Sequence, residues 1–152
     1  MYKHWIGADP GVSGGIALIS DLWHSVEVWP MPDTERDLWE LIERYIPNEN
    51  CIAMIEDVHA FPGDKQRVKQ LATFMRNYGG LRMALIGNGV AMEKVSPQKW
   101  QKYLGCLTKG DKKISKGRAQ ELFPGVKGIT LKTADALLIA EYGKRIHAQK
   151  TA

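Results

Sequence analysis

Short apolar or alternating runs near the start of the chain predict three β-strands. The runs lie at residues 2–8, 15–20 and 24–29. Pro10-Gly11 and Gly14-Gly15 stand between the first two runs, and Ser20-Asp21 follows the second. Because these residues are typical of tight turns, we expect the first thirty residues to form a β-meander.

Apolar residues at helical spacing predict two amphipathic helices. The first spans residues 34–46, begins at a capping-box-like Thr34 and Asp37, and ends at Pro47. The second spans residues 65–86 and carries two apolar stripes. One stripe holds Leu71, Phe74, Tyr78, Leu81 and Leu85, and the other holds Val68, Ala72, Met75, Gly79, Met83 and Ile86. If one stripe faces a sheet, the other needs a second cover, either a helix or another subunit.

The rest of the pattern predicts strands that alternate with helices. Residues 51–55 are continuously apolar, as in a central strand covered on both faces, and residues 90–95 resemble a further strand. Ser96-Pro97 begins a short helix. A basic, turn-prone segment at 108–118 leads to a helix that ends before Pro124, and a last helix spans 133–147. This order predicts an α/β fold in which helices flank a mixed sheet.

The charges divide unevenly along the 152 residues. Residues 1–64 hold 3 Lys/Arg against 12 Asp/Glu, whereas residues 65–152 hold 18 against 5. Such asymmetry suggests contact with nucleic acid. No Ser/Gly/Pro-rich linker separates the halves, so we expect one domain over 1–152.

Membrane and disulfide classes are excluded by composition. No run approaches the roughly 18 apolar residues that a membrane span needs, and Asp9 falls where a signal peptide would have its apolar core. We therefore expect a cytoplasmic protein. Cys51 and Cys106 lack metal or redox spacing and are interpreted as reduced, small hydrophobic residues.

Three acids fall where strands end or where a helix faces inward. Asp9 closes the first strand and Glu56 closes the central one. If these strands are parallel neighbours, both carboxylates stand at the carboxyl edge, where open α/β sheets bind ligands. Asp135 shares its helix face with Leu138 and Ile139, so this face must look inward. Because an ionised acid there is costly unless it is paired or bound to metal, the three acids indicate one cation-binding centre.

Each acid also has a purely structural explanation. Asp9-Pro10-Gly11 is a common turn sequence, Glu56 could pair with a Lys or Arg at the strand end, and Asp135 suits the first turn of any helix. Their joint placement favours a metal site. Oxygen ligands without a His/Cys cluster favour Mg²⁺ or Mn²⁺ over zinc.

Four blocks together resemble the RuvC family of Holliday junction resolvases, within the ribonuclease H-like nucleases. The blocks are 6–15 (IGADPGVSGG), 55–58 (IEDV), 95–100 (VSPQKW) and 134–140 (ADALLIA). They span nearly the whole chain, and the likeness is greatest to the small forms carried by bacteriophages. The resemblance implies a ribonuclease H-like mixed five-stranded sheet flanked by helices, in a bacterial or phage-infected cell.

The resemblance implies a homodimeric endonuclease that nicks opposing strands of four-way DNA junctions. Hydrolysis with two Mg²⁺ ions, for which Mn²⁺ can substitute, would leave 5′-phosphate and 3′-hydroxyl ends. Asp9, Glu56 and Asp135 match three of the family's catalytic metal ligands. Lys132 stands where the family usually has a fourth ligand, Asp or His. This departure leaves two explanations for Lys132 open: it is catalytic and holds the scissile phosphate, or it is a solvated lysine at the start of the helix. Asp57 is an alternative source of the fourth ligand, and a second ion that is held weakly is a further alternative.

Basic residues and two rings complete the expected DNA-binding surface. Lysines on either side of the acids would meet phosphates from two directions. His59 stands where the family has an aromatic residue, and either His59 or Phe61 could stack on an unpaired base, although Phe61 also suits a loop anchor. The expected DNA-binding residues are His59, Phe61, Lys65, Arg67, Lys69, Lys109, Lys112, Lys113, Lys116 and Arg118. A solvated face is the alternative for these basic runs.

Other functions fit parts of the sequence. The Asp-x-Gly hairpin at Asp9 also occurs in actin-like and sugar-kinase ATPases, but 152 residues cannot supply their second domain, so we expect no nucleotide cofactor. A non-catalytic module that binds branched DNA would explain Lys132. Another ribonuclease H-like nuclease would share the three acids. None of these readings involves a membrane.

Overall fold

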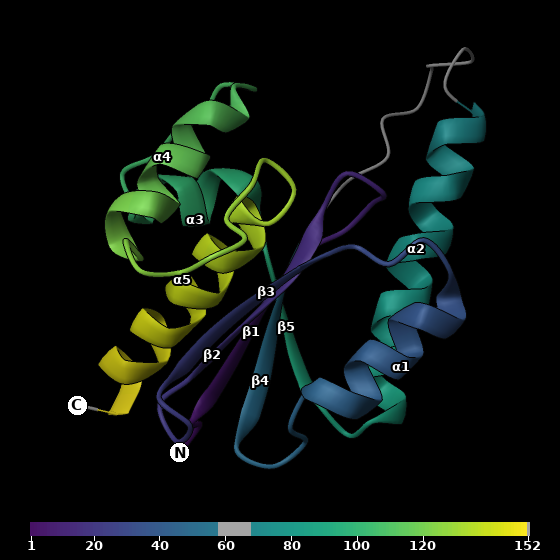
Figure 1. The fold of residues 1–152 in the computed structure, drawn as a ribbon, viewed down its shortest axis with the longest axis horizontal. Coiled ribbons are helices and arrows are strands. Elements are labelled where there is room, and N and C mark those ends of the chain that lie inside the picture. Colours follow the sequence, from purple (N-terminus) through teal and green to yellow (C-terminus); the bar gives the residue numbers. More distant parts are fainter. Residues whose placement is uncertain (58–67, 152) are drawn as a thin grey trace.

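The computed structural model describes residues 1–57 and 68–151 and contains a five-stranded mixed sheet flanked by helices (Figure 1). The strands are β1 (His4–Asp9), β2 (Gly15–Ser20), β3 (Ser25–Pro30), β4 (Cys51–Glu56) and β5 (Ala91–Val95). The helices are α1 (Glu35–Tyr45), α2 (Val68–Gly87), α3 (Pro97–Tyr103), α4 (Lys112–Leu122) and α5 (Ala134–Thr151). The predicted fold class is confirmed.

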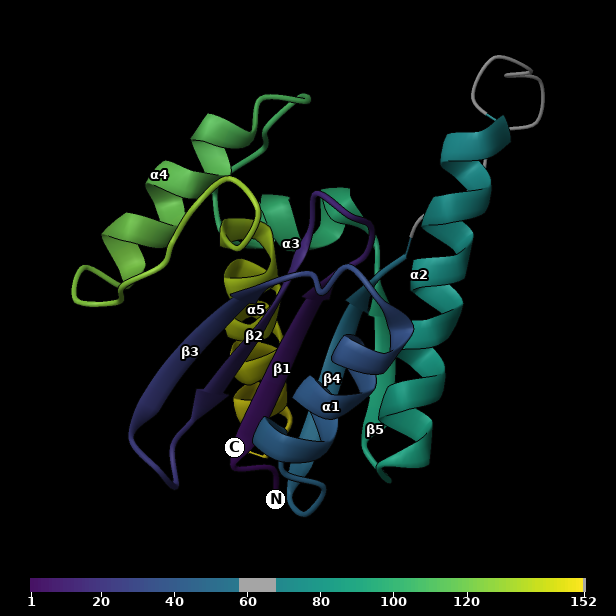
Figure 2. The same ribbon diagram turned by 45° about the vertical axis from the view of Figure 1, so that its right-hand side comes forward.

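The strand order β3-β2-β1-β4-β5 explains where the carboxyl edge lies. Strands β1, β2 and β3 form the predicted antiparallel meander, and β1, β4 and β5 run parallel. Figure 2 shows β1 running from the N-terminus toward the end of the sheet at which α3 and α4 lie and α5 begins. The carboxyl ends of β1, β4 and β5 therefore share one edge.

Helices cover both faces of the sheet, and the residue alternation of the strands decides what each face presents. On one face, Ile6 and Ala8 of β1 join the hydrophobic cluster that includes α1 and α2 residues. On the other, Trp5 of β1 and Met54 of β4 join the cluster built around α5. Figure 1 shows α1 and α2 on one side of the sheet and α3, α4 and α5 on the other. Odd-numbered positions of β1 thus face α5.

Helix α5 packs on β1 with no room for a side chain between them. A Cβ added at Gly7 would lie 1.9 Å from the Ala136 carbonyl oxygen and 2.4 Å from the Ala140 nitrogen. Farther along α5, a Cβ at Gly143 would lie 2.5 Å from Met54 Cγ. Glycine on the strand and small residues on the helix therefore set the separation between α5 and the sheet.

Helix boundaries follow local capping where the sequence offers it. Thr34 caps α1, because its Oγ1 accepts a hydrogen bond from the Asp37 backbone nitrogen at 3.1 Å. Helix α4 begins at Lys112, inside the segment predicted to be turn-like, because the Asp111 side chain accepts from the Lys113 nitrogen at 3.0 Å. No helix in the described part of the chain is long and apolar enough to cross a membrane.

Helix α2 presents one apolar stripe to the sheet and the other to solvent. Tyr78, Leu81 and Leu85 are buried as predicted, but Leu71 from the same stripe is 38% exposed. Leu71 lies in the first turn of α2, and Figure 2 shows that the N-terminal part of this helix extends past the carboxyl end of the sheet. The second stripe includes four exposed residues, Val68, Met75, Met83 and Ile86.

The contact at Gly7 predicts a large loss of stability on a small change. Gly7→Ala should lower the free energy of unfolding by about 2 kcal/mol or more, because α5 backbone atoms cannot move aside as a flexible side chain would. Gly117→Ala in α4 is the control: its Cβ meets nothing within 4 Å, and the helix should gain about 0.5–1 kcal/mol. Urea denaturation measures both, and a wild-type midpoint for Gly7→Ala would contradict the packing argument.

Candidate active site

Asp9, Glu56 and Asp135 approach one another because strand alternation and α5 packing act together. Asp9 ends β1 and Glu56 ends β4, both on the face that α5 covers, since they follow Gly7 and Met54 at two-residue spacing. Asp135 lies in the first turn of α5. Asp9 and Asp135 are both 6% exposed. The structure therefore brings the three predicted acids to the carboxyl edge.

Among the described residues, Lys112 forms ion pairs with two of these carboxylates. Its Nζ lies 3.1 Å from Asp9 Oδ2 and 3.5 Å from Asp135 Oδ2. The residue begins α4 and comes from a segment predicted to bind DNA, yet its ammonium lies between two carboxylates. Burial lowers the pKa of Lys112, but Asp9 and Asp135 outweigh burial and leave the pKa above its usual value. Lys112 is therefore a charged bridge between β1 and α5.

Glu56 is held by a tryptophan that the sequence did not mark as a site residue. Trp100 Nε1 donates a hydrogen bond of 2.8 Å to Glu56 Oε2. The side chain of Trp100 is fully buried. Val95 at the end of β5 pairs with Glu56, and β5 leads directly into α3, so α3 places Trp100 next to Glu56. The signal in the sequence was that Trp100 ends the 95–100 block, one of the four blocks that resemble the RuvC family, but that block gave Trp100 no role.

Burial makes Asp9 and Glu56 costly to ionise. Burial raises the pKa of Asp9 to about 6, with Lys112 opposing the rise and Asp135 adding to it. Burial and then the charge of Asp9 raise the pKa of Glu56 to about 7, against the opposing hydrogen bond from Trp100. Both shifts mean that each of these two acids stays protonated to a higher pH than a carboxyl group exposed to solvent.

The donor types fit a hard divalent cation, but their present arrangement is closed around Lys112. Asp9, Glu56 and Asp135 supply carboxylate oxygens, the ligands that Mg²⁺ and Mn²⁺ prefer. Asp135 Oδ1 is buried without a hydrogen-bond partner, as expected of an oxygen left for an ion. Within residues 1–57 and 68–151, however, no three His, Cys, Asp or Glu side chains are arranged to hold a metal ion as they stand.

A second unpredicted residue, Asn77, fixes the turn that follows Asp9. The Gly11 nitrogen donates a hydrogen bond of 2.7 Å to Asn77 Oδ1 on α2. Gly11 has a φ of +102°, which favours glycine. The Phe74 ring lies 3.0 Å from the position that a Gly11 Cβ would take. Helix α2 thus supports the loop at the carboxyl end of β1.

The remaining predicted site residues are spread around the carboxylates. Lys132 lies just before α5 with an exposed side chain, and its backbone nitrogen donates a hydrogen bond to Thr130 Oγ1. Arg118 donates from Nε to the Leu104 carbonyl at 2.9 Å and so links α4 to the end of α3. Lys69, Lys109 and Lys113 are exposed, and Lys116 is half-buried. The predicted residues His59, Phe61, Lys65 and Arg67 lie outside the described residues.

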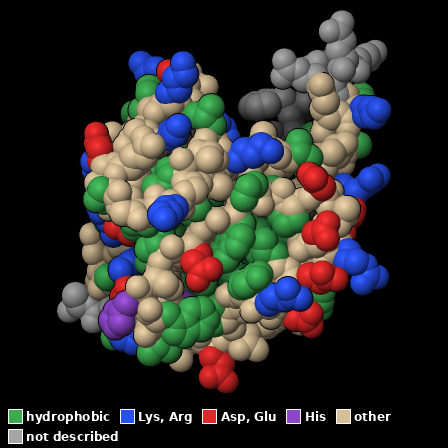
Figure 3. Space-filling model, viewed as in Figure 1, with side chains coloured by type: hydrophobic (Ala, Val, Ile, Leu, Met, Phe, Trp, Pro, Cys, Tyr) green, Lys and Arg blue, Asp and Glu red, His purple; other side chains and the backbone are tan. Residues whose placement is uncertain are grey.

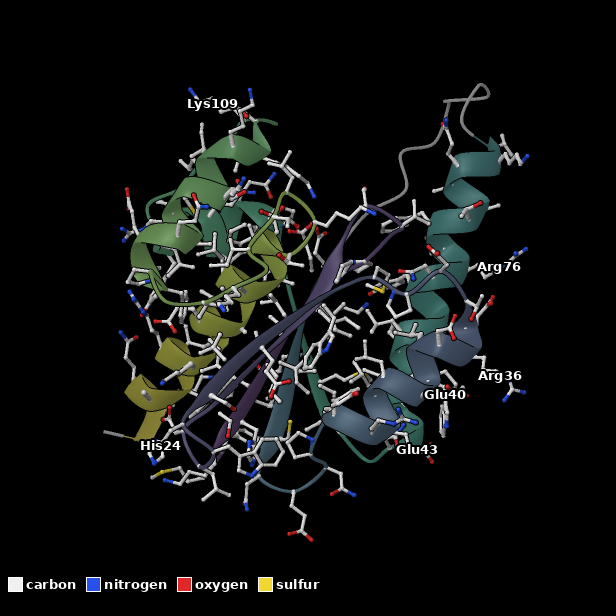
Figure 4. All side chains as sticks on the ribbon, viewed as in Figure 1. His24, Arg36, Glu40, Glu43, Arg76 and Lys109 are labelled. Atoms are coloured by element: carbon white, nitrogen blue, oxygen red, sulfur yellow. The ribbon has the colours of Figure 1, made fainter. Side chains whose placement is uncertain are left out.

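Positive and negative side chains gather on different parts of the surface. Figure 3 shows Lys and Arg over α4 and a group of Asp and Glu over α1 and α2, where basic side chains join them. In Figure 4, Lys109 lies near the start of α4, and Glu40 and Glu43 point outward from α1 on the other side of the sheet. The acidic helix therefore lies away from the basic one.

Comparison with known proteins identifies the fold. No protein-family model matches the chain, and no curated protein matches its sequence. RuvC from Thermus thermophilus, solved in complex with a Holliday junction substrate, has a TM-score of 0.62 and 16% identity over 95% of this chain and 96% of that one. The chain has the RuvC fold. A second T. thermophilus RuvC structure has a TM-score of 0.59 and 17% identity over the same shares. The resemblance to RuvC seen in the sequence is confirmed at the level of the fold.

The raised pKa of Glu56 predicts how the stability of the ion-free protein changes with pH. Because the folded-state pKa lies above the usual 4.5, the stabilisation from the protonated acid is complete below pH 4.5 and is lost as the pH rises through about 7. Glu56→Gln keeps an acceptor for Trp100 and carries no charge. This variant should therefore be more stable than wild type at pH 8 in EDTA, by about 1–3 kcal/mol.

Thermal and urea unfolding between pH 6 and pH 8 test this expectation. The matched control is Glu40→Gln on the solvent side of α1, which should keep the wild-type pH profile. A pH profile of Glu56→Gln that overlays the wild-type curve would contradict the burial of an ionisable Glu56.

Proposed function

We propose that this protein is a structure-selective endonuclease that binds four-way or branched DNA and nicks opposing strands by phosphodiester hydrolysis. The observation that supports this most directly is the meeting of Asp9, Glu56 and Asp135 at the carboxyl edge beside the basic helix α4. The RuvC fold over 95% of the chain supports the same reaction class, because one RuvC neighbour was solved with a Holliday junction substrate.

Asp9, Glu56 and Asp135 are the residues proposed to hold divalent metal ions. When bound, two such ions would supply the positive charge that stabilises the attacking water oxygen and the leaving 3′ oxygen. Departure of the 3′ oxygen would give 5′-phosphate and 3′-hydroxyl ends. Mg²⁺ is the proposed ion, and Mn²⁺ is expected to substitute. Trp100 orients Glu56 through its Nε1 hydrogen bond. Asp9 and Asp135 are buried, and Glu56 is half-buried.

The DNA backbone is proposed to lie across the carboxyl edge between α4 and the N-terminal part of α2. Exposed Lys109 and Lys113 on one side and Lys69 on the other supply positive charge. Phosphate contacts of this kind recognise strand geometry more than base sequence. The roles of His59, Phe61, Lys65 and Arg67 in DNA binding stay predictions from the sequence.

A dimer is proposed because two cuts on opposing strands need two active sites. The second apolar stripe of α2 is the proposed dimer face, since Met75, Met83 and Ile86 in this stripe are all more than 40% exposed. Gly79 lies among them, and a Cβ there would touch nothing within 4 Å. A helix from a second copy could therefore approach closely along this stripe.

A non-catalytic module that binds branched DNA is the second candidate function. The observation that favours it is Lys112, whose ammonium stands between Asp9 and Asp135. A lysine in that position neutralises the acids without any ion. This function predicts junction binding that no divalent ion converts into cleavage.

Cleavage of labelled substrates separates these functions. Wild type with Mg²⁺ should nick a four-way junction symmetrically and should cut linear duplex, flaps and RNA–DNA hybrid less. Asp9→Asn, Glu56→Gln and Asp135→Asn should each lower the nicking rate by at least about 100-fold, because each removes charge that an ion needs. Gel-shift affinity for the junction should stay within a few fold of wild type.

Each alternative outcome has a distinct meaning. Junction binding without cleavage in Mg²⁺ or Mn²⁺ would support the non-catalytic module. A preference for the RNA–DNA hybrid would indicate another ribonuclease H-like nuclease. Full activity of any of the three amide variants at saturating Mg²⁺ would contradict the assignment of its carboxylate.

The dimer face predicts a shift in sedimentation. Met83→Glu places a charge at a 63% exposed position in the α2 stripe and should convert a dimer to a monomer at micromolar concentration. Leu22→Glu is the matched control, since Leu22 is 60% exposed at the turn between β2 and β3. A monomeric wild type, or an equal effect of both variants, would contradict an α2 interface.

A further inference from the structure

Lys112 occupies the place of a cation in the carboxylate group. Its Nζ is within 3.5 Å of oxygens from two different elements, Asp9 on β1 and Asp135 on α5. The side chains of both acids are 8% exposed, so solvent screens the two contacts weakly. An ion bound to the same two oxygens would have to share this space with an ammonium group. Positive charges that close repel strongly in a buried setting.

Lys112 also has a route out of the site. Its side chain is 41% exposed, although its ammonium contacts buried oxygens. The residue is the first of α4, and the loop before it contains Gly110 and Lys109 with φ values of +93° and +48°. The long aliphatic stem can therefore rotate toward solvent while the backbone of α4 stays capped by Asp111.

We propose that Lys112 is an internal counter-cation that closes the carboxylate site and that a divalent ion must displace before it can bind. The ammonium stabilises Asp9 and Asp135 when no ion is present, and it lowers the affinity of the site for divalent ions by the same interaction. This inference rests on the proposed function in that the same carboxylates hold the ion. It assigns Lys112 a regulatory role in addition to the DNA contact expected from the sequence.

Metal binding by the isolated protein tests the inference without any nuclease assay. Mn²⁺ is the probe, and the signal of unbound Mn²⁺ in electron paramagnetic resonance measures its binding. Lys112→Gln keeps a hydrogen-bond donor for Asp9 and removes the charge, and it should bind Mn²⁺ at least about tenfold more tightly than wild type. Lys112→Arg keeps the charge and should bind with affinity close to wild type.

Lys113→Gln is the matched control. It removes the same charge one residue along α4 from an exposed position, so its Mn²⁺ affinity should stay within about twofold of wild type. Equal affinities for Lys112→Gln and wild type would overturn the proposal. An equal gain of Mn²⁺ affinity in Lys113→Gln would also overturn the proposal, because the gain would then come from the lower net charge of the protein and not from loss of the Lys112 contact with the carboxylates.

A measurement on the wild-type protein covers the case in which Lys112→Gln does not fold. Acetylation of lysines, followed by mass spectrometry, should show that saturating Mn²⁺ increases the reactivity of Lys112 relative to Lys113, because the displaced ammonium leaves its carboxylates. Unchanged or reduced reactivity would overturn the inference. Failure of junction cleavage would count against the proposed function and leave both Mn²⁺ measurements interpretable.

Discussion

The close approach of α5 to β1 is the constraint on which the candidate site depends. Gly7 leaves no space for a Cβ against the α5 backbone at Ala136 and Ala140, so the helix lies at one height and in one register over the strand. Asp135 precedes Ala136 by one residue, and Asp9 follows Gly7 by two on the same face. A helix held farther from the strand would separate these carboxylates and leave no common site.

The cost of collecting two buried acids and the half-buried Glu56 is offset by neighbouring groups in different ways. Lys112 provides a charge for Asp9 and Asp135, and Trp100 provides a neutral donor for Glu56. The pKa values of Asp9 and Glu56 nevertheless remain raised, to about 6 and about 7. Functional sites often retain such unfavourable groups because a ligand completes them. Neighbouring groups therefore offset only part of the cost of ionising Asp9 and Glu56. For Asp9, Lys112 makes the largest contribution that lowers the pKa.

The division of charge along the chain becomes a division of surfaces in the fold. The acidic first half supplies β1 with the buried Asp9 and β4 with the half-buried Glu56, and it also supplies the outward-facing acids of α1. The basic second half supplies α4, which lies on the α5 side of the sheet. Because the two helices lie on opposite faces, the acids of α1 do not cancel the field of the α4 lysines at the carboxyl edge.

The sequence by itself determined the strands, most helix positions and the acids at strand ends. Strand alternation and capping are local, so the Thr34 cap and the apolar strands could be read from the pattern, whereas the parallel pairing of β1 with β4 was only a condition there and is shown by the structure. The position of Lys112 could not, because a lysine in a basic run looks the same whether it faces phosphate or a buried acid. Trp100 and Asn77 were missed for the same reason: their partners are 44 and 66 residues away. Only the tertiary structure decided these contacts, since they depend on where packed helices place side chains and not on neighbouring residues.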